Sequence, residues 1–575
     1  MYYNFSALSV TLLKRRFLIP RYLVEGGIVL FLALATVVIN WKMICDGLKG
    51  MTDLTIHMLW LQHFSKQLSE GIWYPRWLAG TNFGYGSPTF VFYPPLAYYI
   101  GSALKLSGLN IEQTMVTLFS LALFISGINF YIYGRNRWGR VASTLGALAY
   151  MTAPYIGFDI YFRGGLASMW AQAGTPIGFW LTDQAIQRPK WRVALAFFFA
   201  LLALTHVPSL LIYIIVWLPY TLYSLVNRSW KDVAATIGFA AIGLGLASFY
   251  LFPAILEKSL LNLEFVKEIY GGFKLNLFGS PLPSKPHIIK HLLRMQHIFV
   301  HQGLSIILLT VIALFCHYKN TARKKETLCW LLLLMTLSFL MSYPSLPIWV
   351  ASPTLQTIQF PWRFLAISSF GGAALLGLTV NGIIKKPLPL KVLLSLIIVV
   401  IIFFNLRYSY HLSRTLPTLH NPGRGKVASL EKLKLIISEP YTNKLMDVAE
   451  LKPLLKTGVS TPDPVIGQPP VSVIVGKSEI QLRKWGSYNR IFNVIVEEVS
   501  TIRIRTYYYP AWHLYVNNQP YPIDVSDDGT MNLKLKPGSY AVELRYGWTR
   551  FFTLGVFISL ASIIVLIFCH LKKKL

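Results

Sequence analysis

Hydrophobic runs of about 20 residues recur through most of this chain, and each is long enough to cross a hydrocarbon core about 30 Å thick. The composition agrees, since 54% of the 575 residues are hydrophobic and 14% are charged, against about a quarter charged in a soluble protein. The sequence therefore predicts a polytopic α-helical membrane protein with about twelve spans. The expected helices are 25–45, 112–134, 141–160, 166–185, 191–207, 209–227, 234–257, 298–318, 327–345, 363–384, 389–407 and 550–571.

The formal net charge of +30 comes in large part from short basic clusters between the hydrophobic runs. Lys and Arg gather in the cytoplasmic loops of membrane proteins. With the N-terminus inside, every cluster falls on the cytoplasmic side of the twelve-span topology. Membrane orientation thus accounts for these clusters, and we expect no nucleic-acid partner, because the basic residues are not gathered on one domain. The clusters lie at 14–16, 135–140, 188–192, 228–231, 323–325, 385–386 and 572–574.

The same topology leaves three non-membrane stretches outside. Within the first, residues 93–108 are apolar but short and open with Tyr-Pro-Pro, so we expect a juxtamembrane or re-entrant segment rather than a span. The expected organisation is a cytoplasmic N-terminus (1–24), a transmembrane core (25–407) with outer loops 46–111 and 258–297, an outer domain (408–549), and a final helix with a basic cytoplasmic tail (550–575).

The outer domain changes pattern along its length. Its start is of mixed α/β character, with one helix expected around 427–437. From about 471, apolar and polar residues alternate in seven short stretches spaced about ten residues apart, with turn signals such as Asp527-Asp528-Gly529 between them. This pattern predicts a small antiparallel β-sandwich-like fold.

The four cysteines and twelve histidines form no recognisable disulfide or metal pattern. The cysteines lie in or beside hydrophobic runs without paired spacing. His287 and His291 are four residues apart, with His297 and His301 further on, but no nearby carboxylate or cysteine completes a site. We therefore expect no cofactor, and the sequence gives no support for a divalent cation.

The polar stretch 46–111 carries the residues best suited to chemistry. Asp53 and His57 share one face of an amphipathic helix expected over 53–68, although a lone acid there also suits a helix N-cap. The motifs that follow Asp53 are rich in aromatic residues and contain an Arg, and they have two interpretations. Aromatic side chains stack on sugar rings and Arg binds phosphate, which favours a substrate site. Alternatively, the aromatic residues form a belt at the membrane interface. The motifs that follow Asp53 are Trp73-Tyr74-Pro75-Arg76-Trp77, Gly84-Tyr85-Gly86-Ser87-Pro88 and Phe92-Tyr93-Pro94-Pro95-Leu96.

The order of these motifs resembles that of bacterial membrane proteins of the 6-pyruvoyl-tetrahydropterin synthase-related family. Gln359-Phe360-Pro361-Trp362-Arg363 also resembles the family pattern, and Tyr508-Tyr509-Pro510-Ala511-Trp512 stands where the family often has Pro-Gly-Trp. The resemblance runs from about residue 25 to 550. The family is similar to the GT-C superfamily of integral-membrane glycosyltransferases, which implies a GT-C-like core.

The resemblance implies a polyprenyl-phosphate sugar donor and transfer to an envelope glycan, lipid or protein at the outer face of the bacterial cytoplasmic (inner) membrane, with both termini cytoplasmic. In that superfamily an acid of the first outer loop, here Asp53, serves as catalytic base or orients the acceptor. Arg76, Arg163 and Arg363 are candidates to stabilise the leaving lipid phosphate, with interfacial snorkelling as the alternative for Arg76 and Arg363.

Two further ionisable residues, His206 and Glu257, lie at the outer ends of predicted spans, where such groups have either functional or purely structural roles. The full set of expected substrate-binding residues is His57, Arg76, Trp77, Tyr85, Tyr93, Asp159, Arg163, His206, Glu257 and Arg363.

One departure from the family pattern concerns a second outer acid. Related proteins commonly show an Arg-Gly followed a few residues later by Glu, but here Arg163-Gly164 has no such Glu after it. Asp159 either substitutes from the other side of Arg163 or pairs with it. A two-acid or metal-assisted mechanism is thereby in doubt. A flippase or transporter of lipid-linked sugars and a non-catalytic scaffold of envelope polysaccharide assembly remain as alternatives.

Overall fold

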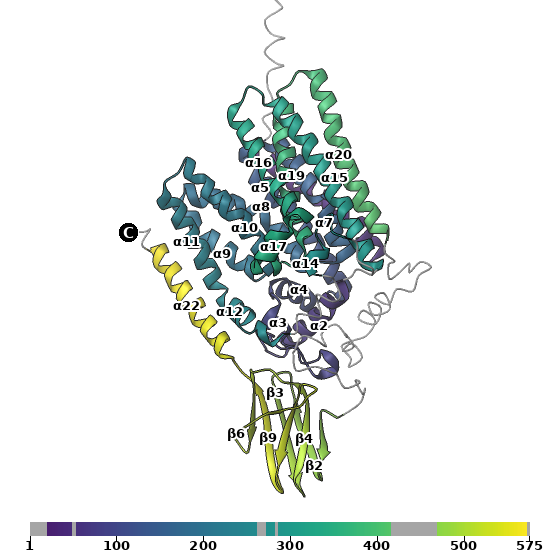
Figure 1. Ribbon diagram of the computed structural model, residues 1–575, viewed down its shortest axis with the longest axis vertical. Helices are drawn as coiled ribbons and strands as arrows, with labels where there is room; N and C mark the ends of the chain where they lie inside the picture. The colour runs from purple at the N-terminus through teal and green to yellow at the C-terminus, as the bar shows by residue number, and fades with distance from the viewer. Residues whose placement is uncertain (1–19, 49–52, 262–271, 282–285, 416–468, 572–575) are drawn as a thin grey trace, which may run out of the picture.

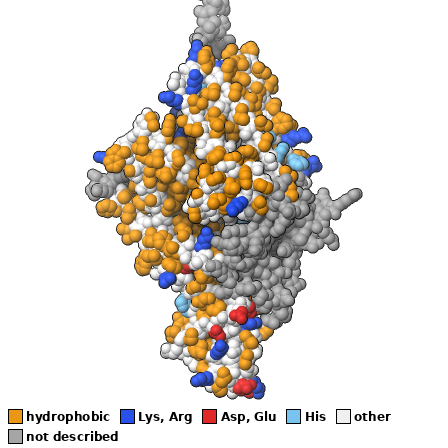
Figure 2. Space-filling model, in the orientation of Figure 1, with side chains coloured by type: hydrophobic (Ala, Val, Ile, Leu, Met, Phe, Trp, Pro, Cys, Tyr) orange, Lys and Arg blue, Asp and Glu red, His pale blue; other side chains and the backbone are white. Residues whose placement is uncertain are grey.

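The computed structural model describes residues 20–48, 53–261, 272–281, 286–415 and 469–571, so the helix expected around 427–437 lies outside the described residues. A long helical body carries a β-rich region at one end, and α22 (Arg550–Leu571) returns from this region along the body (Figure 1). Hydrophobic side chains cover most of the described helical surface in view, whereas the acidic side chains in view lie mainly on the β-rich end (Figure 2). This distribution suits a body in lipid and an end in water.

Seven described helices are long and apolar enough to cross a membrane, or eight if the pair α11 (Trp230–Leu246) and α12 (Ser248–Leu256), bent by 74°, is one span. This agrees with a multi-pass membrane protein, whereas the count of twelve spans stays a prediction. The seven are α1 (Arg21–Asp46), α5 (Ile111–Trp138), α10 (Val207–Tyr223) with η5 (Ser224–Val226), α15 (Pro286–Cys316), η8 (Pro361–Phe364) with α19 (Leu365–Ile383), α20 (Leu388–Thr415) and α22.

The predicted single helix 141–160 is wrong, because the chain breaks before Pro154. Ala153 has a ψ of 135°, as expected for a residue that proline pushes out of the helical region. Helix α6 (Arg140–Met151) therefore stops, and the chain continues as α7 (Pro154–Phe158) and a single π-turn, η3 (Asp159–Arg163). The remaining helices of the body are α8 (Leu166–Gln187), η4 (Pro189–Trp191), α9 (Arg192–Ala203), η6 (Lys258–Leu260), α14 (Gly272–Leu275), α16 (Thr321–Leu340), η7 (Tyr343–Ser345), α17 (Leu346–Ala351) and α18 (Pro353–Gln356).

The first long loop is packed against the helical body. Its main helix, α2 (Leu54–Ser69), buries most of its side chains and packs on α4 (Leu96–Leu106) and α5. Helix α4 has 11 residues, about 16 Å in length, which is too short to cross the membrane. Between them lie η2 (Asn82–Gly84) and α3 (Thr89–Phe92). The described part of the loop is therefore packed into the fold.

The β-rich region contains two antiparallel sheets, with strand orders β1-β4-β8-β7 and β2-β3-β9-β5-β6. Each of the seven predicted strand patterns has a counterpart, and β6 and β7 are additional. Alternate residues of β3 and β4 are buried, and inward-facing residues of both sheets belong to one hydrophobic cluster. The strands are β1 (Val471–Val475), β2 (Ser478–Trp485), β3 (Asn489–Val496), β4 (Ser500–Tyr507), β5 (Trp512–Val516), β6 (Gln519–Tyr521), β7 (Asp524–Val525), β8 (Thr530–Leu535) and β9 (Gly538–Tyr546).

The loop between α2 and α4 contributes side chains to this β-region cluster. Trp77 is fully buried, and its ring lies 5.6 Å from that of Trp512 and 5.8 Å from that of Tyr546. The Trp77 backbone N–H donates to the Tyr488 hydroxyl at 3.0 Å. Gly86 has a φ of +82°, and a Cβ there would lie 2.4 Å from the Trp77 indole nitrogen. The loop and the β-rich region thus share one core.

Gly86→Ala tests this shared core. We expect a loss of about 1–3 kcal/mol in the free energy of unfolding, because the new methyl group forces the buried Trp77 ring to move. The matched control is Gly71→Ala, since Gly71 also has a positive φ of +84° but open space around it. Thermal unfolding of the purified variants measures the difference, and equal destabilisation by both substitutions would contradict the close packing of Gly86 on Trp77.

Candidate functional site

Asp53 lies at the N-terminal end of α2 and is tied to the π-turn η3 by two contacts. Its Oδ2 accepts a hydrogen bond from Arg163 Nε at 3.0 Å, and its backbone N–H donates to the Arg163 carbonyl at 2.8 Å. The Asp53 side chain is 30% exposed, whereas that of Arg163 is 14% exposed. Asp53 thus combines a fixed position with access to solvent.

Asp159 lies on the other side of the same arginine and is fully buried. Its carboxylate accepts hydrogen bonds from Arg163 Nη1 at 3.1 Å, Ser168 Oγ at 2.5 Å and Gln172 Nε2 at 2.7 Å. Burial raises the pKa of Asp159, against the opposing effect of the Arg163 charge. Burial lowers the pKa of Arg163, but the charges of Asp159 and Asp53 outweigh this and the net shift is upward.

Aromatic and imidazole groups of the loop border the two carboxylates. His57 is buried, and its Nδ1 lies 2.7 Å from the Tyr98 hydroxyl oxygen. Burial lowers the pKa of His57 to about 4, so the imidazole is neutral at physiological pH. The ring centre of Tyr93 lies 5.9 Å from that of His57. Burial raises the pKa of Tyr93, and the charges of Arg163 and Asp53 act on it as well.

Two further basic side chains, Arg363 and His206, approach the site from the helical body. Arg363 is 8% exposed and donates to the Ile358 carbonyl at 2.6 Å, yet its buried Nε has no hydrogen-bond partner among the described residues. It lies within electrostatic range of Arg163, Asp53 and Asp159. His206 Nδ1 lies 2.7 Å from the Ser209 hydroxyl oxygen, and the His206 side chain is buried within electrostatic range of Arg363 and Arg163.

Seven of the predicted site residues therefore lie in one cluster, which we call the Asp53 site. Two carboxylates and two guanidinium groups lie there; the carboxylate of Asp53 is partly exposed, whereas that of Asp159 is buried. An exposed carboxylate can take a proton from a ligand, and a guanidinium without a carboxylate partner can bind an anion. The members are Asp53, His57, Tyr93, Asp159, Arg163, His206 and Arg363.

The other four predicted residues lie instead at the joint between the helical body and the β-rich region. Arg76 Nη2 donates to the Gly547 carbonyl at 2.9 Å, and its guanidinium lies 3.9 Å from the centre of the Phe552 ring. Tyr85 stacks on Tyr507 with ring centres 5.1 Å apart, and Trp77 is enclosed by the β-region cluster.

Glu257, the fourth residue of the joint, ends α12 and accepts a hydrogen bond from the Tyr509 hydroxyl. Its Oε1 is buried without a hydrogen-bond partner among the described residues. These four residues hold two parts of the fold together, and their expected role in substrate binding stays a prediction.

The sequence-based prediction missed three side chains that hold the Asp53 site, namely Ser168, Gln172 and Tyr98. Ser168 and Gln172 are four residues apart on α8, so they share one helix face, and this spacing just after Arg163-Gly164 was an available signal. Tyr98 follows the Pro-Pro motif, in a run of aromatics where nothing distinguishes it from Tyr99.

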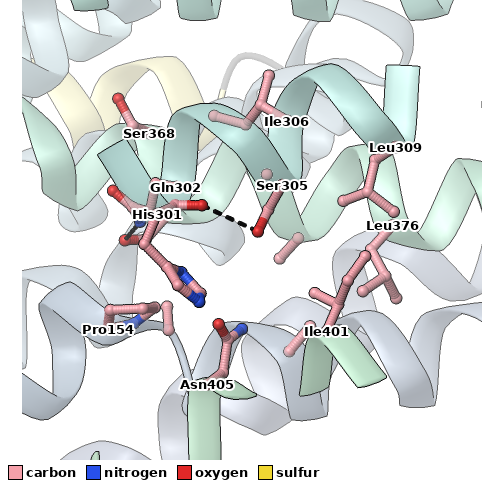
Figure 3. Close-up of a pocket in the computed structure, with 15 residues that line it drawn as sticks. Pro154, His301, Gln302, Ser305, Ile306, Leu309, Ser368, Leu376, Ile401 and Asn405 are labelled. Atoms are coloured by element: carbon pink, nitrogen blue, oxygen red, sulfur yellow. Dashed lines mark hydrogen bonds between the residues drawn. The ribbon is translucent and has the colours of Figure 1, made fainter. Parts of the chain in front are cut away.

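Three histidines of α15, namely His291, His297 and His301, contact different neighbours and do not converge on a metal site. His291 packs against Phe158 and Trp362, His297 stacks on Tyr408, and His301 lines a separate cavity between α15, α19 and α20 (Figure 3). Among the residues that the structure describes, no group of three His, Cys, Asp or Glu could hold a metal ion. The cavity in Figure 3 has a volume of about 40 Å³, enough for a few water molecules.

The family model described as "6-pyruvoyl-tetrahydropterin synthase related domain; membrane protein" matches residues 90–413. The chain belongs to this family. Its matched region includes Tyr93, Asp159, Arg163, His206 and Arg363 of the Asp53 site. A comparison with curated proteins gives no match.

A comparison with solved structures finds several similar chains at low sequence identity. The oligosaccharyltransferase of Archaeoglobus fulgidus is 12% identical with a TM-score of 0.44, over 72% of this chain and 60% of that one. Arabinofuranosyltransferase AftD from Mycobacteria is 16% identical with a TM-score of 0.43, over 69% and 27%. ArnT from Cupriavidus metallidurans, bound to undecaprenyl phosphate, is 13% identical with a TM-score of 0.30, over 62% and 78%. The chain thus spans less than two thirds of the first protein and about a quarter of the second.

The two carboxylates of the Asp53 site should differ sharply in their contribution to stability. Asp159→Asn removes the charge that balances buried Arg163, and we expect a loss of about 3 kcal/mol or more. Asp53→Asn breaks a partly exposed ion pair, so its cost should be about 0–1 kcal/mol. Thermal unfolding of the purified variants measures both, and a larger loss for Asp53→Asn would contradict the roles given to the two acids.

The buried neutral His57 predicts a loss of stability in acid. Its pKa is about 4 in the folded protein and about 6.5 in an unfolded chain. Between these values the unfolded state binds more protons, so stability is lost as pH falls from about 6.5 to about 4, by about 3 kcal/mol for this residue. His57→Gln, which retains a partner for Tyr98, should reduce this loss. Exposed His513→Gln is the control, and unfolding midpoints at about pH 7 and about pH 4.5 provide the measurement; an unaltered pH dependence in His57→Gln would refute the assignment.

Proposed function

We propose that this protein is a membrane glycosyltransferase that uses a polyprenyl-phosphate-linked sugar donor. The acceptor is an envelope glycan, lipid or protein at the outer face of the bacterial cytoplasmic membrane. The topology that goes with this proposal has twelve spans, both termini in the cytoplasm and the β-rich region, with a sandwich-like fold, outside. The sequence resemblance to GT-C enzymes motivates the reaction class.

The observation that carries the proposal is the exposed carboxylate of Asp53 held by Arg163. One carboxylate oxygen accepts from Arg163 Nε at 3.0 Å, and the other accepts no hydrogen bond from a described residue. That second oxygen is free to accept the proton of an acceptor hydroxyl. As the hydroxyl oxygen forms its bond to the anomeric carbon of the sugar, the bond from that carbon to the lipid-phosphate oxygen breaks, and the proton passes to Asp53.

Arg363 supplies the complementary charge for the leaving group. Its guanidinium is buried, has an Nε without a hydrogen-bond partner and has no carboxylate partner among the described residues. A buried cation without a counter-ion is costly, and a lipid phosphate would provide that counter-ion. Charge-assisted contacts to a phosphate strengthen as the leaving group gains negative charge in the transition state. Arg163, held between two carboxylates, acts mainly by fixing Asp53.

The two alternative functions find less support in the geometry. A flippase needs a passage for a sugar, and the cavity described between α15, α19 and α20 holds about 40 Å³, which is room for a few water molecules. A scaffold requires neither an exposed carboxylate in a fixed position nor an unpaired buried guanidinium. We propose that the reaction proceeds without a resident metal ion.

A transfer assay tests the proposal. Purified protein in lipid nanodiscs receives radiolabelled undecaprenyl-phosphate sugars and a membrane extract as acceptor, with a chelator in one arm and magnesium in another. We expect label transfer that falls about 100-fold or more in Asp53→Asn, because the general base is lost.

Asp46→Asn is the matched control, since Asp46 is another acid of the same loop region but forms only an exposed i,i+4 pair with Lys42 at 3.3 Å. Thermal unfolding confirms that both variants are folded. Equal transfer by wild type and Asp53→Asn would refute the role of Asp53. No transfer from any donor would favour a scaffold, and loss of transfer in the chelator arm would refute the metal-free reaction.

A further inference from the structure

The β-rich region has a cleft of about 240 Å³ at the edge formed by β5 and β6. We propose that this cleft binds a neutral oligosaccharide, the glycan part of the acceptor, and this substrate assignment rests on the proposed transferase function. The side chains that line it include Tyr508, Trp512, His513, Tyr515 and Tyr521.

The strand pattern explains why aromatic groups reach this edge. Along β5, Trp512, Leu514 and Val516 are buried while His513 is exposed and Tyr515 is partly exposed. Strand β6 is the last strand of its sheet, so no further strand covers the cleft. The Tyr521 hydroxyl donates to the Lys534 carbonyl on β8 at 2.5 Å, which fixes this tyrosine between the two sheets. The cleft is therefore built from positioned side chains rather than from a loose loop.

The chemistry of the lining fits an uncharged sugar. None of the described residues that line the cleft is Lys, Arg, Asp or Glu, in a chain whose formal net charge is +30. The hydroxyls of Tyr508 and Tyr515 have no hydrogen-bond partner among the described residues, so they are available to sugar hydroxyls. Aromatic faces pack against the apolar C–H faces of sugar rings, and the polar edges of Tyr and His bind the hydroxyls.

The position of the cleft connects it with the transfer site. Tyr508 lies between two residues that attach the β-rich region to the rest of the protein: the Tyr507 N–H donates to the Tyr85 carbonyl at 2.9 Å, and the Tyr509 hydroxyl donates to Glu257. Trp512, at the base of the cleft, also contacts Trp77 of the loop. A glycan held here is thus bound to the structural unit that includes the loop carrying Asp53.

A binding experiment on the full chain tests the cleft without requiring turnover. Purified protein in nanodiscs is titrated with fluorescent neutral oligosaccharides (glucan, mannan, galactan, arabinan and rhamnan fragments) and with an anionic oligogalacturonate. We expect saturable binding of at least one neutral probe, weakened about tenfold in Tyr515→Ala and in Tyr508→Ala, and weaker binding of the anionic probe.

Tyr540→Ala is the control, because Tyr540 is a partly buried tyrosine on the neighbouring strand β9 outside the cleft. The expected result is unchanged binding in this control. Absence of binding by every neutral probe, or equal binding by Tyr515→Ala and wild type, would overturn the inference. If the protein binds a neutral oligosaccharide but transfers no sugar, glycan binding by the cleft is supported and the proposed transferase function is refuted. The failures of the two proposals are therefore distinguishable.

Discussion

The geometry of the candidate site depends on one buried guanidinium, that of Arg163. A charge at 14% exposure is stable only when it is paired and hydrogen-bonded, and Asp53 and Asp159 provide the two pairs. Because one partner lies at the start of α2 and the other in the π-turn η3, satisfying this single side chain fixes the loop against the helical body. The break at Pro154 is part of the same arrangement, since it allows the turn that carries Asp159 and Arg163.

A second constraint, the burial of Trp77, makes the β-rich region part of the same unit. An indole of this size removes a large apolar surface from water, and here the surface that covers it comes from strands more than 400 residues later in the chain. Around the buried Trp77, hydrogen bonds of Arg76 and Glu257 also join the helical body to the β-rich region. The distance between the Asp53 site and the β5–β6 cleft is thereby set by packed side chains rather than by a flexible linker.

Local patterns were enough to predict most of the elements. The alternation in β3 and β4, the amphipathic α2 and the motif order that led to the family could all be read from short windows. The roles of Trp77, Tyr85 and Glu257 could not, because an aromatic residue next to Pro and Gly is equally suited to stack on a sugar or to enter a core. Their partners Trp512, Tyr507 and Tyr509 are distant in the sequence, so only the tertiary structure reveals these contacts. The break at 152–153 was missed because hydropathy continues through it.

The absent second acid has a physical explanation in the surroundings of Asp159. With three donors on its carboxylate and no exposure, Asp159 neutralises and orients Arg163 and has no free contact for a substrate. In the proposed reaction, Asp53 alone is left to exchange a proton. Arg363 then becomes the decisive group, because folding has buried a guanidinium without a described counter-ion and so incurred an electrostatic cost. In the proposed reaction, a lipid phosphate would supply the missing charge beside the partly exposed carboxylate of Asp53, and such a ligand is a reason for the cost to persist.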